Sequence, residues 1–172
     1  MARFDLDEHT RVLRDMQASI EAIRWETGGE KIELPVKLKV HDSVFVPLAK
    51  WAMLLTGNYR CITKDGPRSI QEAVHTNPKE SRAVYDWVCE LCIRLGAAPE
   101  DLVVFEKYAA AAQGLVRPSS AARALFGGAP NIERVDRLVL AIAAQVGLRN
   151  PVVEEIVSLV DAQLEKNRRA TS

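Results

Sequence analysis

The strongest constraint on this chain is the spacing of its apolar residues, which recur every three or four positions through most of the sequence. This spacing puts them on one face of an α-helix. Asn77-Pro78 and Asn150-Pro151 are typical helix starts, with a capping side chain followed by proline at the first helical position. The spacing predicts a mainly α fold, a bundle of about seven or eight helices. The expected helices span residues 6–25, 47–56, 69–75, 78–95, 99–113, 118–126, 131–146 and 151–167.

Two stretches are expected to lie outside the regular elements. Residues 57–67 run from a glycine to a proline and read as a polar loop. Residues 166–172 are basic and are expected to fray from the end of the last helix.

Residues 31–40 change the apolar period from helical spacing to alternation. Their apolar members predict one amphipathic β-strand and are Ile32, Leu34, Val36, Leu38 and Val40. Pro35 cannot donate a ladder hydrogen bond, so the strand is expected at a sheet edge. No second strand in the sequence is as clear, and a lone strand is marginal. These five residues are therefore candidates for pairing with another subunit or partner.

The patterns divide the chain at about residue 42. Residues 1–42 form a helix plus strand that we interpret as an arm or assembly element, and residues 43–172 form a helical domain. Within it, 43–97 resembles 99–150: Lys50-Trp51-Ala52 before Gly57 matches Lys107-Tyr108-Ala109 before Gly114. The similarity indicates a tandem repeat followed by a final helix over 151–167. The alternative is that any two runs of three helices align by chance.

Composition excludes several classes of protein. The 23 basic residues equal the 23 acidic ones, which argues against a non-specific nucleic-acid wrapper. Residues 1–78 and 79–172 are each balanced, so neither half is a basic module. Three cysteines form no disulfide framework and fit a reducing compartment. The charged start lacks a signal core, and no apolar run reaches the ~20 residues of a membrane span. We expect a cytoplasmic protein, or a virion component, that does not enter membranes.

The sequence carries no recognisable catalytic or metal-binding motif. Cys89 and Cys92 have the spacing of a redox pair, but they lie in mid-helix without further metal ligands, so core packing is the better interpretation. His41-Asp42-Ser43 cannot form a triad, because adjacent side chains do not converge. We therefore expect a non-enzymatic protein with no metal, cofactor or small-molecule substrate.

Residues 106–148 resemble a helix-turn-helix of the lambda-repressor/Xre class. The resemblance rests on the small-residue helix Tyr108 to Ala112 ending at Gly114, then 118–126, then Gly127-Gly128-Ala129-Pro130 and a helix ending in Gly147-Leu148. It implies a domain over 79–167 that binds DNA through residues 118–126 in the major groove. The implied nucleic-acid-binding residues are Arg117, Ser119, Ser120 and Arg123. Here the turn is one residue longer than in the family.

Two other functions fit the same patterns. A self-assembling structural subunit, such as a viral coat, nucleocapsid-like or scaffold protein, is favoured by neutral charge and by the strand without a partner. Its main partner would be itself, as a homo-oligomer. A protein–protein adaptor would offer an amphipathic groove to a partner helix.

Overall fold

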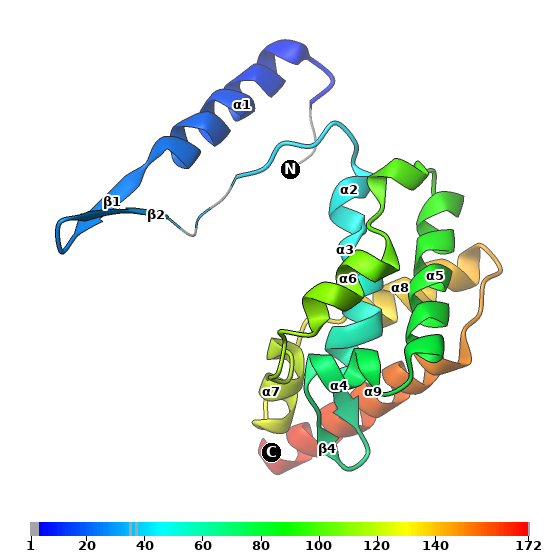
Figure 1. Ribbon diagram of the computed structural model, residues 1–172. Coiled ribbons are helices and arrows are strands. Elements are labelled where there is room, and N and C mark those ends of the chain that lie inside the picture. The colour runs from blue at the N-terminus through cyan, green and yellow to red at the C-terminus, as the bar shows by residue number, and fades with distance from the viewer. Residues whose placement is uncertain (1–3, 35, 37, 172) are drawn as a thin grey trace. The chain divides into compact units, whose positions relative to one another are not determined.

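The computed structural model describes residues 4–34, 36 and 38–171, which fall into two compact units, Met1–Pro47 and Leu48–Ser172 (Figure 1). Most described residues are helical, and the strands form two short antiparallel pairs. The prediction of a mainly α fold is confirmed. The division lies a few residues after the expected boundary at 42. Among the described residues, no helix combines the length and the hydropathy that crossing a membrane requires.

Unit 1 is built on helix α1 (Asp7–Ala22). The helix ends three residues before the expected position, because the backbone becomes extended at Ile23. Only Thr10 and Leu13 are buried in it. A later segment lies along the helix: the Val40 N–H donates to Gln17 Oε1 over 2.9 Å.

A hairpin of β1 (Arg24–Thr27) and β2 (Glu30–Glu33) follows α1. Gly28 and Gly29 form its turn with φ of 61° and 84°, as a two-residue hairpin turn requires. The predicted strand over 31–40 was therefore wrong in extent, and its pairing with another subunit stays a prediction. It ends at Glu33 and pairs within the chain. The rest of the predicted set has no strand structure at Leu34, Val36, Leu38 and Val40, while Pro35 and Lys37 lie outside the described residues.

The chain enters unit 2 through α2 (Phe45–Leu48) and α3 (Lys50–Met53). Helical structure then continues through a π-helical segment, Leu54–Asn58, and a 3₁₀ turn, Tyr59–Cys61. The loop expected from Gly57 onward was wrong. Gly57 is buried, and a Cβ atom there would lie 1.9 Å from the Tyr108 hydroxyl oxygen. Glycine thus lets this segment pack against Tyr108, a contact that local sequence does not reveal.

The next elements form a short hairpin and two capped helices. The hairpin is β3 (Ile62–Thr63) with β4 (Gly66–Pro67). Helix α4 (Ile70–His75) begins with a capping box between Ser69 and Glu72. Helix α5 (Pro78–Arg94) begins as predicted, with the Asn77 side chain accepting from the Glu80 N–H over 3.2 Å.

The second half of unit 2 holds a 3₁₀ turn (Pro99–Asp101) and helices α6 (Phe105–Ala112), α7 (Ser120–Phe126), α8 (Val135–Gln145) and α9 (Pro151–Thr171). The expected helix over 99–113 is broken because residues 102–104 are not helical. The fraying tail was also wrong, since α9 continues to Thr171. The tandem repeat stays a prediction.

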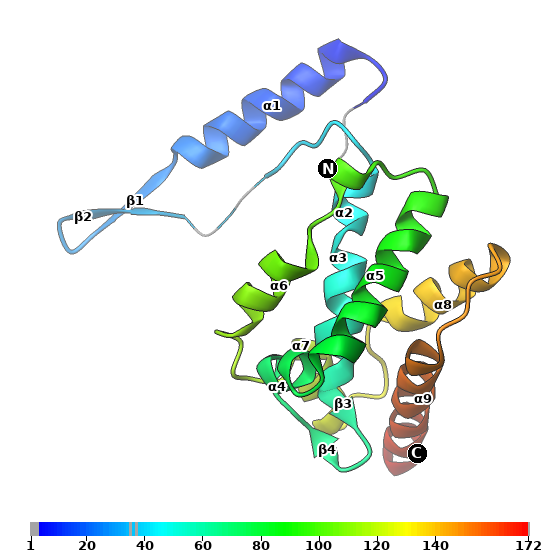
Figure 2. The same ribbon diagram turned by 45° about the vertical axis from the view of Figure 1, so that its right-hand side comes forward.

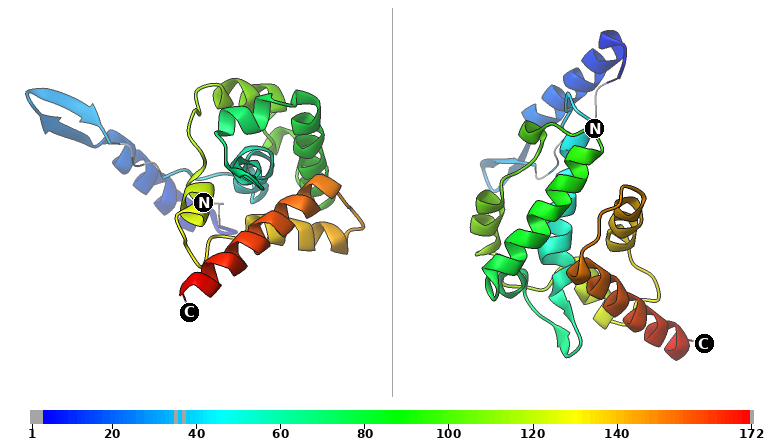
Figure 3. Two further views of the ribbon diagram at one scale, coloured as in Figure 1. Left: turned by 90° about the horizontal axis from the view of Figure 1, so that it is seen from below. Right: turned by 90° about the vertical axis from the view of Figure 1, so that its right-hand side faces the viewer.

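In unit 2, α5 runs beside α3 and the π-helical segment, and α8 packs against α9 (Figures 2 and 3). A polar cluster joins these groups. The Tyr59 hydroxyl donates to the Glu133 carbonyl over 2.5 Å and accepts from the Val135 N–H over 3.0 Å. Burial raises the pKa of Tyr59 to about 12. Beside it, Arg134 pairs with the fully buried Asp136 and with Asp161 of α9, so the start of α8 is fixed from both sides.

Candidate functional site

Three segments of unit 2 meet around α7: the β3–β4 hairpin, residues 113–130 and the last turns of α9 (Figures 1 and 3). Helix α7 packs on both α9 and β4, and β3 packs on α9. Residues 62–68, 113–130 and 162–171 carry five more basic than acidic residues, although the whole chain is neutral. We call this surface the basic end. Its charged members are Lys64, Arg68, Arg117, Arg123, Lys166, Arg168 and Arg169, with Asp65 and Glu165.

Helix α7 is fixed by Ser119, which corrects one sequence prediction. The Ser119 hydroxyl accepts from the Ala122 N–H and donates to the Asn58 carbonyl over 2.7 Å. Ser119 is 3% exposed. Because it is buried and already bonded, Ser119 cannot reach a base edge in this conformation. The other three predicted residues, Arg117, Ser120 and Arg123, are exposed.

The loop between α6 and α7 is held by the start of α4. The N–H groups of Ile70 and Gln71 donate to the carbonyls of Arg117 and Leu115 over 3.2 and 3.0 Å. This arrangement leaves Leu115 and Val116 exposed. A pocket of about 440 Å³ opens beside the loop. Its lining brings together all four residues predicted from the sequence, Arg117, Ser119, Ser120 and Arg123.

The last turns of α9 are tied to the α7 region by Asn167. Its Nδ2 donates to the carbonyls of Leu125 and Ala129 over 2.7 and 2.9 Å. Arg168 Nε donates to the Pro130 carbonyl over 2.9 Å. These bonds explain why the tail is helical rather than frayed. They also hold Lys166 beside α7, a position that the sequence did not suggest.

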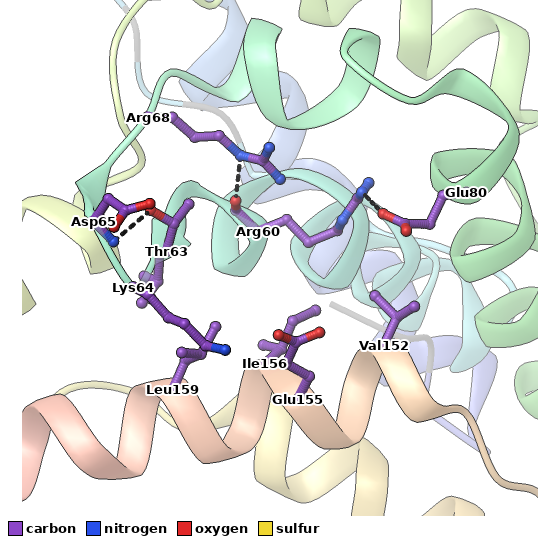
Figure 4. A pocket seen from close by; sticks show the side chains of 11 residues that line it. Arg60, Thr63, Lys64, Asp65, Arg68, Glu80, Val152, Glu155, Ile156 and Leu159 are labelled. Carbon is purple, nitrogen blue, oxygen red and sulfur yellow. Dashed lines mark hydrogen bonds and ion pairs between the residues drawn. The ribbon is translucent and has the colours of Figure 1, made fainter.

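Two adjoining pockets, which share Lys64 and Leu159, form a groove between the β3–β4 hairpin and α9. Figure 4 shows the residues that line the first of them. One pocket, of about 290 Å³, includes Arg68 and Glu155. The other, of about 270 Å³, includes Phe126 and Lys166. Lys64 lines both pockets. The groove therefore offers cations along its length, with carboxylates concentrated in the first pocket.

Arg60, although it lines the first pocket, has a structural role. It is 5% exposed, pairs with Glu80 and donates to Ser81 Oγ over 2.7 Å. Its carbonyl accepts from Arg68 Nε over 2.8 Å, as Figure 4 shows. Burial lowers the pKa of Arg60, while the nearby Glu80 opposes that shift. Arg60 is therefore engaged with the protein and is not a free ligand for an anion.

The packing around α6 and α7 bears on the helix-turn-helix resemblance. Helix α6 packs on α4 and α5, whereas α7 packs mainly on α9 and β4. In a helix-turn-helix, the first helix crosses the DNA backbone while the second enters the groove. Here α7 is short and exposes Ser120 and Arg123 from one side. Ser120 and Arg123 therefore present a hydroxyl and a cation on one exposed side of α7.

The other candidate residues from the sequence are two cysteines and a histidine. Burial raises the pKa of the Cys89 thiol to about 11, and burial also raises the pKa of Cys92. Both thiols thus stay protonated at neutral pH, the opposite of a reactive thiolate. His75 Nε2 lies 3.1 Å from the Ala109 carbonyl. In the part of the chain that the structure describes, no cluster of three His, Cys, Asp or Glu residues could hold a metal ion.

Comparisons with known proteins add no relative: no protein-family model, curated protein or solved structure matches this chain.

Proposed function

We propose that this chain is a non-enzymatic nucleic-acid-binding protein whose basic end contacts phosphates. The observation that carries the proposal is charge segregation: a neutral chain gathers five surplus cations on three converging segments. Residues 113–130 contain two arginines and no acidic residue. Such a basic surface is the electrostatic footprint of nucleic-acid binding.

The exposed cations are available to a ligand. Lys64, Arg117, Arg123 and Lys166 make no ion pair with any described residue. Arginine and lysine contacts to phosphates position a nucleic acid without reading its sequence. If α7 also entered the major groove, as in a helix-turn-helix, Arg123 and Ser120 would contact base edges and binding would depend on sequence.

Fluorescence anisotropy of labelled duplex and single-stranded oligonucleotides, measured against salt, tests the proposal. Each phosphate contact contributes a slope of about −0.9 in log affinity against log salt on duplex DNA. Lys166→Ala and Arg123→Ala should each weaken binding and reduce that slope by about one. A loss confined to some sequences would point to base reading by α7, and a uniform loss to backbone contacts.

Lys50→Ala is the matched control. Lys50 is exposed, makes no ion pair with a described residue and begins α3, which is not part of the basic end. It should bind like the unchanged protein. If Lys50→Ala and Lys166→Ala lost the same affinity, the effect would come from the change in net charge and not from the basic end. No binding at low salt would overturn the proposal.

A second candidate function, a self-assembling structural subunit in the cytoplasm or in a virion, is favoured by a different observation. Of the fourteen large hydrophobic residues that are exposed in the described part of the chain, nine lie in unit 1, which is about a quarter of the chain. Exposed apolar surface of this kind marks protein–protein contacts. Size-exclusion chromatography with light scattering should show oligomers, and a monomer at all concentrations would contradict this function.

A further inference from the structure

Unit 1 buries too little of its own apolar surface to be stable as a separate unit. Its described residues bury one apolar side chain, Leu13. All eight strand residues of the β1–β2 hairpin are exposed, including the cross-strand pair Trp25 and Ile32. A two-stranded hairpin and one helix with so small a core do not offset the entropy of ordering the chain. Another surface must therefore cover part of unit 1.

The uncovered face of α1 has a definite chemistry. Val12 and Met16 are 57% and 49% exposed, and their spacing puts them on one side of the helix. Ile23, which follows the end of α1, is 48% exposed. Glu8 is four residues before Val12 and Asp15 is three residues after it, so both carboxylates border the stripe along one edge. Neither makes an ion pair with a described residue. The face is an apolar stripe with an acidic border.

Unit 2 presents the complementary surface beside α7. Leu115 and Val116 are 43% and 66% exposed, and they line the pocket of about 440 Å³ together with Arg117 and Arg123. Both arginines are without an ion pair among the described residues. This surface is an apolar patch with a basic border. It matches the α1 face in both apolar character and sign of charge.

We propose that the α1 face of one copy docks on the Leu115–Arg123 pocket of a second copy. Charge complementarity selects this occupant: unit 1 has two more acidic than basic residues, and unit 2 has the reverse excess. A contact of α1 with another α1 would instead bring the acidic borders together. The contact is heterologous, so each copy donates one face and accepts another, and chains of subunits can form. It requires no nucleic acid, although the two ligands would compete for Arg117 and Arg123.

Sedimentation velocity of the full chain without nucleic acid, over a range of concentrations, tests the docking. Met16→Asp puts a charge into the stripe, and Val116→Asp puts one into the patch. Both positions are exposed, so the variants should keep the far-ultraviolet circular dichroism that the unchanged protein shows at a concentration where it is monomeric. Each should weaken self-association at least tenfold. A 1:1 mixture of the two variants should associate again, because the intact stripe of one fits the intact patch of the other.

The mixture separates the possible outcomes. Association of the unchanged protein that only Met16→Asp disrupts, with no recovery on mixing, would indicate a contact between α1 helices and overturn the proposal. A monomer at every concentration would overturn it as well. Asp15→Arg should weaken association, and combining Asp15→Arg with Arg123→Asp should restore it. Failure of the oligonucleotide measurement would leave these results unchanged, so the two proposals fail independently.

Discussion

Units 1 and 2 contain the same kinds of residues, but they differ in how much of their apolar surface they bury within themselves. In unit 2, α5, the π-helical segment and α9 bury Val84, Leu55 and Val160 almost completely. In unit 1, α1 has comparable apolar spacing, yet Met16 and Val12 stay exposed. An apolar stripe stabilises a helix only when other elements cover it, and unit 1 supplies one short segment and a hairpin.

Amphipathic spacing alone does not distinguish a helix face that packs in a core from one that docks on a partner. A core face and a docking face predict the same helix from the sequence. They differ only in how many other elements pack on them. Unit 1 therefore depends on a contact outside itself, whereas unit 2 carries its own core and positions the basic end.

The largest expected effect comes from matched aspartates in the two units. Asp136 pairs with Arg134 in unit 2 and is completely buried, while Asp42 pairs with Arg14 in unit 1 and its side chain is 77% exposed. Asp136→Ala should lower the free energy of unfolding by about 3–5 kcal/mol, because it leaves a largely buried arginine short of a partner. Asp42→Ala should cost about 1 kcal/mol or less. Urea denaturation measures both free energies of unfolding. Equal losses would contradict the difference between the two units.

The tightness of the unit 2 core can be tested at Gly57. Gly57→Ala should cost about 1–3 kcal/mol, because the added Cβ collides with the Tyr108 hydroxyl. Tyr108→Phe removes that hydroxyl, together with its hydrogen bond to the Met53 carbonyl. The double variant should therefore be more stable than the sum of the two losses predicts. Additive losses in thermal denaturation would show that the segment relaxes elsewhere.

Acid should weaken the link between α8 and α9. Burial of Asp161 would raise its pKa, but hydrogen bonds from Arg134 and Arg137 outweigh burial and hold the pKa below its ordinary value. A lowered folded pKa contributes stability above the ordinary carboxyl value, and this is lost as pH falls through the folded pKa. The unfolding free energy should therefore decline below about pH 4. Asp161→Asn should show a smaller decline, and an unchanged pH profile would remove this role.

The smallest effect concerns the cysteines, which all lie in unit 2. With a pKa of about 11, Cys89 should react slowly with iodoacetamide at pH 8, and faster as pH approaches that value. Cys61 and Cys92 are buried and should react only after unfolding. Mass spectrometry of timed reactions measures each site. Rapid reaction of Cys89 at pH 7 would revive the interpretation of Cys89 and Cys92 as a redox pair.

Local signals predicted the helix starts well. The caps at Asn77 and Asn150 depend only on neighbouring residues, and both side chains accept N–H groups as expected. The errors arose where distant residues decide the structure. Gly57 lies in a helical segment where it packs against Tyr108, and in the tail after Lys166 the Asn167 side chain donates to carbonyls near α7.

The candidate site was only partly visible in the sequence. Arg117, Ser120 and Arg123 were found because they are neighbours in one segment, and Ser119 was misassigned because its cap at α7 was not recognised. Lys64 and Lys166 were missed because they lie far apart in the sequence and meet only in the fold. Each half of the sequence has equal numbers of basic and acidic residues, so charge counts by halves did not reveal the basic end.

Hydrogen–deuterium exchange of the full chain at several protein concentrations tests the dependence of unit 1 on a second copy most directly. The amides of α1 should be protected at high concentration and should exchange faster on dilution. Those of α5 and α9 should be equally protected throughout. Protection of α1 that does not change on dilution, in a chain that stays monomeric, would contradict the account.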